Sequence, residues 1–161
     1  MAELHILGHL QSAFHYSEST LFCRYSFQSG PNWTLVGGCS EGQTVSVLKK
    51  SYFLTGWPKL ILQVSCLDSI GRSWIVGYGS CSIPSSPGLH NLTVPCWVPA
   101  ATTIADQLRQ KFLGGANELT QTDIINLGSD RFKLITKSKG DITLNINLIL
   151  RNFSLFGVEY K

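Results

Sequence analysis

Four histidines are the side chains of this chain that could move protons near neutral pH: His5, His9, His15 and His90. Catalysis or metal binding would need a carboxylate or a second ligand close to them. His5 and His9 stand four residues apart in an alternating segment, which places them on one face of a strand without a carboxylate at a metal-type spacing. No nucleophile elbow, phosphate loop or dinucleotide motif accompanies them. We therefore interpret the histidines as solvent-face residues and predict no catalytic, cofactor-binding or metal-binding residue.

The five cysteines are odd in number and form no Cys-x-x-Cys pair: Cys23, Cys39, Cys66, Cys81 and Cys96. This spacing argues against a disulfide framework and against a zinc site. Cys23 and Cys96 have aromatic neighbours in the sequence, but no base is placed beside either. Because the N-terminus also lacks a basic region followed by an apolar run, we expect a cytoplasmic protein with reduced thiols.

Asp68 is the candidate calcium ligand, because sandwich domains that bind calcium use carboxylates at loop tips. Calcium needs several oxygen ligands that converge on one loop end. Ile70 occupies the position where a second ligand would stand, and the remaining aspartates are scattered along the sequence. We interpret Asp68 as a turn-forming residue.

Charge is sparse: 14% of residues are charged, and the formal net charge is +3. The basic clusters are small: Lys49 and Lys50, then Arg131, Lys133, Lys137 and Lys139. They are too few for a nucleic-acid footprint, so no nucleic acid is expected. Two interpretations stay open, a solvated or edge-strand face and contact with anionic lipid or an acidic partner. Low charge with 43% hydrophobic residues also fits a surface partly covered by partners.

The segment 59–83 predicts a central β-hairpin. Its first half puts four side chains on one face, and a period of two is typical of a half-buried strand: Leu60, Leu62, Val64 and Cys66. After a polar turn at 68–72, the second half is expected to put three on one face: Trp74, Val76 and Tyr78. Gly77 and Gly79 predict a bulge or a close backbone approach inside that strand.

Further short segments predict strands at 4–10, 21–27, 33–36, 89–94, 131–136 and 142–150, with turns or loops at 11–19, 41–44 and 137–140. A helix is expected after Thr102 or Thr103, where Ile104, Leu108 and Phe112 form an apolar stripe. Many short strands and one short helix indicate an all-β, antiparallel sandwich. No repeat or linker is visible, so residues 1–161 are expected to form one domain.

Short motifs that are weak singly follow one another in a specific order along nearly the whole chain. They are STLFC at 19–23, Trp33 with Leu35, EGQT at 41–44, GWPKL at 56–60, Asp68 with Gly71 and Arg72, GYG at 77–79, PSSPG at 84–88, Pro95 with Trp97 and Pro99, GG at 114–115, DR at 130–131, LRNF at 150–153 and GV at 157–158. With these motifs the chain resembles the B9-domain family of ciliary proteins.

This resemblance implies a C2-like β-sandwich without calcium ligands, and a non-catalytic role. It implies assembly with other B9-domain proteins and tectonic-type proteins, in the tectonic-like (Meckel syndrome) complex of the ciliary transition zone, where the complex supports cilium formation and the diffusion barrier. It also implies association with γ-tubulin, and a place at the basal body and axoneme. The alternative is a peripheral domain that binds anionic lipid without calcium, through its basic face.

The chain departs from the family pattern between Val45 and Thr55. There the family sequence is longer and carries an added strand with a His-Pro pair, whereas this segment is shortened. Losing a strand would expose the ladder of its former neighbour. We therefore expect this chain to be less stable alone than its longer relatives, and a B9 partner to pair with the exposed edge.

Overall fold

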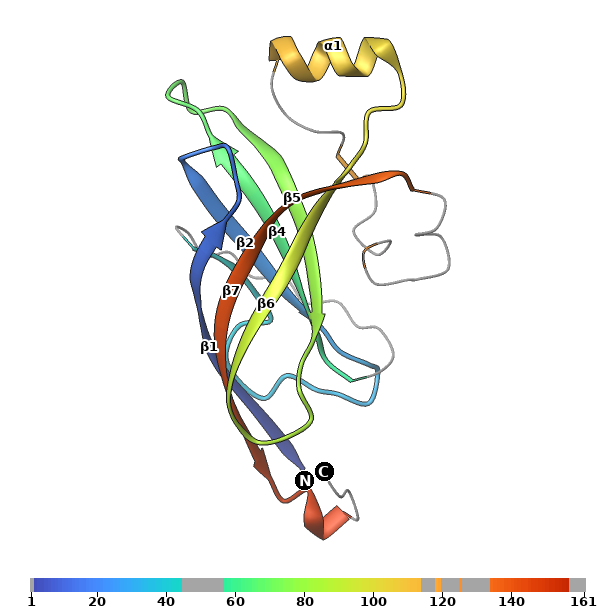
Figure 1. Cartoon of the computed structure of the whole chain (residues 1–161). Coiled ribbons are helices and arrows are strands. Elements are labelled where there is room, and N and C mark those ends of the chain that lie inside the picture. The colour runs from blue at the N-terminus through green and yellow to red at the C-terminus, as the bar shows by residue number, and fades with distance from the viewer. Residues whose placement is uncertain (1, 45–56, 114–117, 120–124, 126–133, 157–161) are drawn as a thin grey trace.

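The computed structural model describes residues 2–44, 57–113, 118–119, 125 and 134–156 (Figure 1). Their strands form one antiparallel sheet in the spatial order β1-β7-β6-β5-β4-β2-β3. The elements are β1 (Glu3–Phe14), β2 (Leu21–Gln28), β3 (Glu41–Gln43), β4 (Lys59–Leu67), β5 (Ser73–Ser82), β6 (Gly88–Pro99), α1 (Ile104–Leu113), β7 (Thr136–Arg151) and a 3₁₀ turn η2 (Ser154–Phe156). The predicted all-β, C2-like antiparallel sandwich with one short α-helix is confirmed.

The sheet folds over between β5 and β6. These strands are paired at two positions, Tyr78 with Trp97 and Gly79 with Cys96, whereas β6 and β7 pair from Gly88 to Pro99. The fold-over divides the sheet into two layers, β1-β7-β6 and β5-β4-β2-β3, which face one another in Figure 1. This geometry lets one sheet enclose its own core.

The core lies between the two layers and is filled by every second residue of the strands that bound it. Its buried members are Cys23, Leu60, Leu62, Val64, Cys66, Val76, Ile83, Val94, Cys96, Ile142, Leu144, Ile146 and Leu148. Each buried aliphatic side chain contributes about 1.5–3 kcal/mol relative to an exposed one. The alternation of β7, the clearest in the sequence, therefore translates directly into packing.

A second, smaller cluster covers the outer face of β4, β5 and β6. Ile61, Tyr78 and Trp97 meet Ile125 there. The Tyr78 hydroxyl accepts a hydrogen bond of 3.1 Å from the backbone N–H of Leu119. Residues that follow α1 in sequence are thereby held against the sheet by apolar burial and one polar contact.

The central hairpin is confirmed, but the predicted face of Tyr78 is wrong. The pairing of β4 with β5 shifts register beside Val76, because Val64 pairs with Gly77 and Ser65 with Ile75. One extra residue reverses the alternation, so Tyr78 points outward while Val76 points into the core. The bulge and the close approach expected at Gly77 and Gly79 are confirmed, because a Cβ on Gly79 would lie 2.9 Å from Cys96 Sγ.

Several element boundaries differ from the prediction. Residues 33–36 are irregular, residues 41–43 form the edge strand β3, and β1 continues to Phe14 where a loop was expected. The expected turn at 137–140 lies inside β7, because pairing with β6 on one side outweighs the local turn preference. Of the strand expected at 131–136, residues 134–135 are irregular and 131–133 lie outside the described residues.

The predicted helix is confirmed as α1. The backbone N–H of Gln107 donates to the carbonyl oxygen of Thr103 at 3.0 Å, which makes Thr103 the N-cap. An apolar stripe usually faces the core, yet Ile104, Leu108 and Phe112 are exposed. Figure 1 shows why, because α1 stands away from both layers at one end of the sandwich. The expected closing glycines, Gly114 and Gly115, lie outside the described residues.

Candidate interaction surfaces

The four histidines are dispersed over the sandwich. His5 and His9 lie on the outward side of β1, His15 on the connection from β1 to β2, and His90 on β6. Three of them contact different neighbours: His5 Nε2 lies 3.4 Å from Glu3 Oε2, His15 Nδ1 lies 3.0 Å from Asp141 Oδ2, and His90 Nε2 lies 2.9 Å from the carbonyl oxygen of Ser86. Within the described residues, no group of three His, Cys, Asp or Glu could hold a metal ion.

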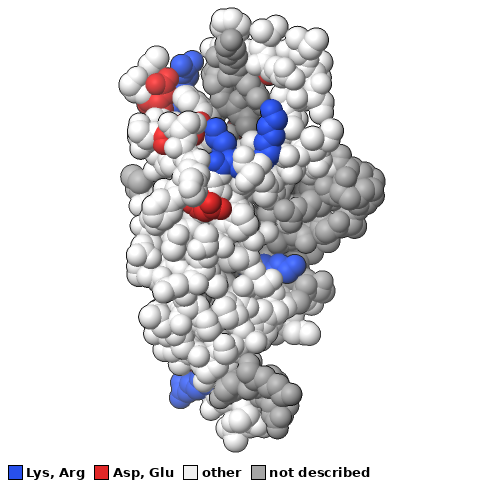
Figure 2. All heavy atoms as spheres, viewed as in Figure 1, with Lys and Arg blue, Asp and Glu red and all other residues white. Residues whose placement is uncertain are grey.

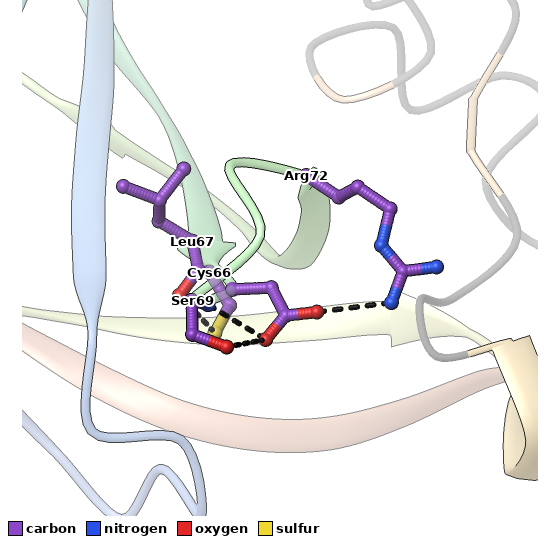
Figure 3. Close-up of polar contacts among 5 residues, drawn as sticks. Cys66, Leu67, Ser69 and Arg72 are labelled. Atoms are coloured by element: carbon purple, nitrogen blue, oxygen red, sulfur yellow. Dashed lines mark hydrogen bonds and ion pairs between the residues drawn. The ribbon is translucent and has the colours of Figure 1, made fainter.

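Asp68 uses both carboxylate oxygens to hold the turn between β4 and β5. Figure 3 shows the polar contacts of this turn, with Ser69 and Arg72 labelled. Oδ1 accepts from the Ser69 N–H at 2.7 Å, and Oδ2 accepts from Arg72 Nη2 at 2.9 Å. The hydrogen bond from Arg72, with those from Ser69, lowers the pKa of Asp68. The neighbouring Ile70 is exposed and offers no ligand, so the geometry matches a turn-forming residue.

The thiols considered as nucleophiles are buried in the core. Burial raises the pKa of Cys23 to about 12, and burial also raises the pKa of Cys96. A thiol reacts as its thiolate, so these two are inert near neutral pH. None of the five cysteines is joined to another in a disulfide.

The basic residues are divided between the described and the undescribed parts of the chain. Lys49, Lys50, Arg131 and Lys133 lie outside the described residues. On β7, Lys137 is exposed, while Lys139 Nζ lies 3.1 Å from Glu18 Oε1. Burial acts to raise the pKa of Glu18, but the hydrogen bonds from Lys139, Ser17 and the backbone, with the charge of Lys139, together outweigh it and the pKa is lowered. Figure 2 shows few charged side chains on the visible face, most of them toward the end that carries α1.

An open apolar groove, which we call the open-side groove, lies between β1 of one layer and the β2 side of the other. β1 bounds it on one side, and β2 with the residues after it bounds it on the other. Two adjoining hollows of about 540 and 310 Å³ make it up, and both are lined by Ile6, Leu7, Phe27 and Cys39. Gly8 also lines this groove and pairs with Ile146 of β7, where the strands approach closely: a Cβ on Gly8 would lie 2.8 Å from the carbonyl oxygen of Asn145.

Exposed apolar side chains also mark the outer face of the layer β1-β7-β6. Leu7 and Leu89 both pair with Asn147, so the three residues form one row across the layer. Leu7 is 59% exposed and Leu89 is 72% exposed, and Ile149 is exposed beside them. Such a sparsely charged, partly apolar face is typical of a surface that binds another protein.

Known proteins match the chain over almost its whole length. The profile of the family described as "Ciliary basal body-associated, B9 protein" matches residues 4–149. The chain belongs to the B9 family. It is 40% identical to human B9 domain-containing protein 2 and 36% identical to the Drosophila melanogaster protein of that name, with 99% or more of each chain covered. It is 28% identical to mouse B9 domain-containing protein 1, over 97% of this chain and 85% of the mouse protein.

No solved structure gives a significant match to this B9 chain. The alignment with the human relative extends over 175 positions, more than the 161 residues here, so the relative carries residues that have no counterpart in this chain. The segment 45–55, where the sequence predicts a shortening, lies outside the described residues. No helix in the described part is long and apolar enough to cross a membrane.

Sequence reasoning identified the family but left the interaction surface unknown. The structure adds three surfaces: the open-side groove, the outer face of β1-β7-β6, and the stripe on α1. The sequence held a signal for the second, because Leu7 alternates with His5 and His9 at positions that should face solvent. It held no signal that the α1 stripe would face away from the core.

Proposed function

We propose that this chain is a non-catalytic component of the tectonic-like (Meckel syndrome) complex at the ciliary transition zone. It assembles there with other B9-domain proteins and tectonic-type members, and it supports cilium formation and the ciliary diffusion barrier. The observation that carries the proposal is the B9 family match over residues 4–149. The whole chain, 1–161, acts as a single B9 domain in this proposal.

Two features of the described residues support an interaction role rather than an enzymatic one. The candidate acids, bases and thiols are dispersed or buried, whereas reactive groups in an active site must lie within hydrogen-bond reach of one another. Exposed apolar residues instead gather on two faces: Leu7, Leu89 and Ile149 on the outer layer, and Ile104, Leu108 and Phe112 on α1. A partner protein that binds these faces would bury their apolar surface.

The proposed location is the cytoplasm at the base of the cilium, namely the basal body, the transition zone and the axoneme. The basal body is part of the family's own description. γ-Tubulin is a proposed further partner at that site, and nucleic acid is not.

Co-purification with tagged B9-domain proteins from ciliated cells tests the proposal. We expect the chain to co-purify with at least one other B9 protein and to concentrate at the transition zone by fluorescence microscopy. A substitution of the buried Leu62 to Asp, which should unfold the core, serves as the negative control. Failure of the folded wild-type chain to bind any B9 protein would contradict the proposal.

A second candidate function is peripheral binding to anionic lipid without calcium. The observation that favours it is the exposed stripe of Ile104, Leu108 and Phe112 on a helix that stands away from the body. An amphipathic helix of this kind can lie in a membrane interface. Flotation with phosphatidylserine vesicles should then recover the wild-type chain but not the variant Phe112→Glu. Recovery of neither would remove this candidate, and equal recovery of both would show that α1 is not the membrane contact.

A further inference from the structure

The strand β1 is a long edge strand with little protection against pairing. It pairs with β7 on one side, and no described residue pairs with its other side. Protein edges are usually protected by Lys, Pro or short length. β1 spans 12 residues, contains no Pro or Lys, and has one charged residue, Glu3. Its backbone ladder therefore offers a row of hydrogen-bonding groups to another extended strand.

The outward side chains of β1 have a two-fold order about Leu7. They read Glu3, His5, Leu7, His9 and Gln11. If an identical strand ran antiparallel with Leu7 at the centre, Leu7 would face Leu7 of the second copy, and His5 would face His9 of the second copy. Glu3 would face Gln11 of the second copy. The regular pairing of β1 with β7 runs from Glu3 to Leu10, and Gln11 lies at the register shift that ends it.

The charges on this edge are compatible with such a pairing. Glu3 Oε2 lies 3.4 Å from His5 Nε2 and 3.5 Å from Arg151 Nη1 of its own chain. In the proposed register it would face Gln11 of the second copy, which carries no charge. The centre of the row is Leu7, which is 59% exposed and would become covered. The visible face carries few charges away from the α1 end (Figure 2), so no cluster of like charges opposes contact.

We propose that two copies of this chain pair antiparallel through β1, around a two-fold axis at Leu7. The two β1-β7-β6 layers then form one continuous sheet, and the interface is isologous, since the same residues contribute from both copies. An unrelated strand could use the same backbone groups, but the two-fold order of the side chains suits a second copy. The pairing stands whether or not the chain joins a ciliary complex.

Cysteine cross-linking tests the register. In a background with the exposed Cys39 replaced by Ser, Leu7→Cys should form a disulfide with itself under mild oxidation, because opposed Cα atoms lie about 4.5–5.5 Å apart. His9→Cys should not react with itself, because the two positions are offset by four residues, about 13 Å. A mixture of His5→Cys and His9→Cys proteins should react. Cross-linking of His9→Cys with itself as readily as Leu7→Cys would overturn the register.

Sedimentation equilibrium tests the association itself. Leu7→Lys places two like charges opposite each other and should weaken the dimer roughly tenfold or more. Leu89→Lys is the matched control, because Leu89 lies in the same row on β6, away from the edge, and is 72% exposed. It should leave the dimer unchanged, and thermal melts should show both variants folded. A wild-type chain that is monomeric at its highest soluble concentration, or that pairs solely with a different B9 protein, would overturn the proposal.

Discussion

The two buried tyrosine hydroxyls should respond oppositely to removal. The Tyr16 hydroxyl is buried and has no hydrogen-bond partner among the described residues. Its polar neighbour is the Cys96 thiol, a weak hydrogen-bonding group, and burial together with that thiol raises the pKa of Tyr16. Tyr78, which is 1% exposed, instead accepts a hydrogen bond from Leu119. Substitution of either residue by Phe keeps the ring and removes the oxygen alone.

The expected changes follow from the two environments. An unpaired hydroxyl in a protein interior costs about 1–3 kcal/mol. Because the Tyr16 ring is half-buried, we expect Tyr16→Phe to raise the free energy of unfolding by up to about 1 kcal/mol, at the lower end of that range. Tyr78→Phe should lower it by about 0.5–1.5 kcal/mol, because it leaves the Leu119 N–H without its acceptor. For a chain of this size, 1 kcal/mol corresponds to about 2–4 °C in Tm.

Guanidinium unfolding followed by circular dichroism measures both variants, with hydrogen exchange at Leu119 as a local readout. The exchange rate of the Leu119 amide should rise in Tyr78→Phe and stay unchanged in Tyr16→Phe. Tyr16→Ala is the control for the ring, and because the ring is half-buried, loss of its packing should cost less than the about 3–5 kcal/mol of a fully buried aromatic side chain. If Tyr16→Phe destabilised the chain as much as Tyr78→Phe, the Tyr16 hydroxyl would be well paired and the reasoning would be refuted.

The remaining predictions concern ionisation, metal, thiols and chain length. Burial acts to raise the pKa of Glu18, but hydrogen bonds, of which the one from Lys139 is the largest, together lower it below its ordinary 4.5. The lowered pKa stabilises the fold above that pH, and this contribution is lost as pH falls through the lower folded value. Lys139→Met should reduce that loss, by less than about 1 kcal/mol, in acid titrations of stability. Calorimetry should detect no saturable micromolar calcium binding, and such binding would contradict the role of Asp68 as a turn-forming residue. Rapid alkylation of cytosolic protein should modify all five thiols, and a consistent disulfide in the mass spectrum would refute the expected compartment. A version with a longer, family-type segment in place of 45–55 should melt at higher temperature, and equal melting with equal partner binding would show the short segment to be sufficient.

The family was readable from the sequence because its motifs are local. The turn at Asp68, Gly71 and Arg72 sets its own geometry, with Gly71 at a φ of +84° and Asp68 bonded to its near neighbours. The alternation of β7 determines which residues face the core, since side chains along a strand change face at every step. These features depend on residues close together in the chain, so they can be predicted without knowing which distant segments pack against them.

Tertiary structure decided which face or edge each segment presents. The bulge at Val76 moved Tyr78 to the outer cluster, and that shift depends on how β5 pairs with β4. Residues 137–140 form part of a strand because β6 lies beside them and pairs with them. The stripe on α1 was predicted by its spacing, but its exposure follows from the position of the helix beyond the end of the sandwich. The alternation of inward and outward side chains along β1 is visible in the sequence. That β1 is an edge, with Leu7 at the centre of an exposed row, follows from strand order, which long-range pairing sets.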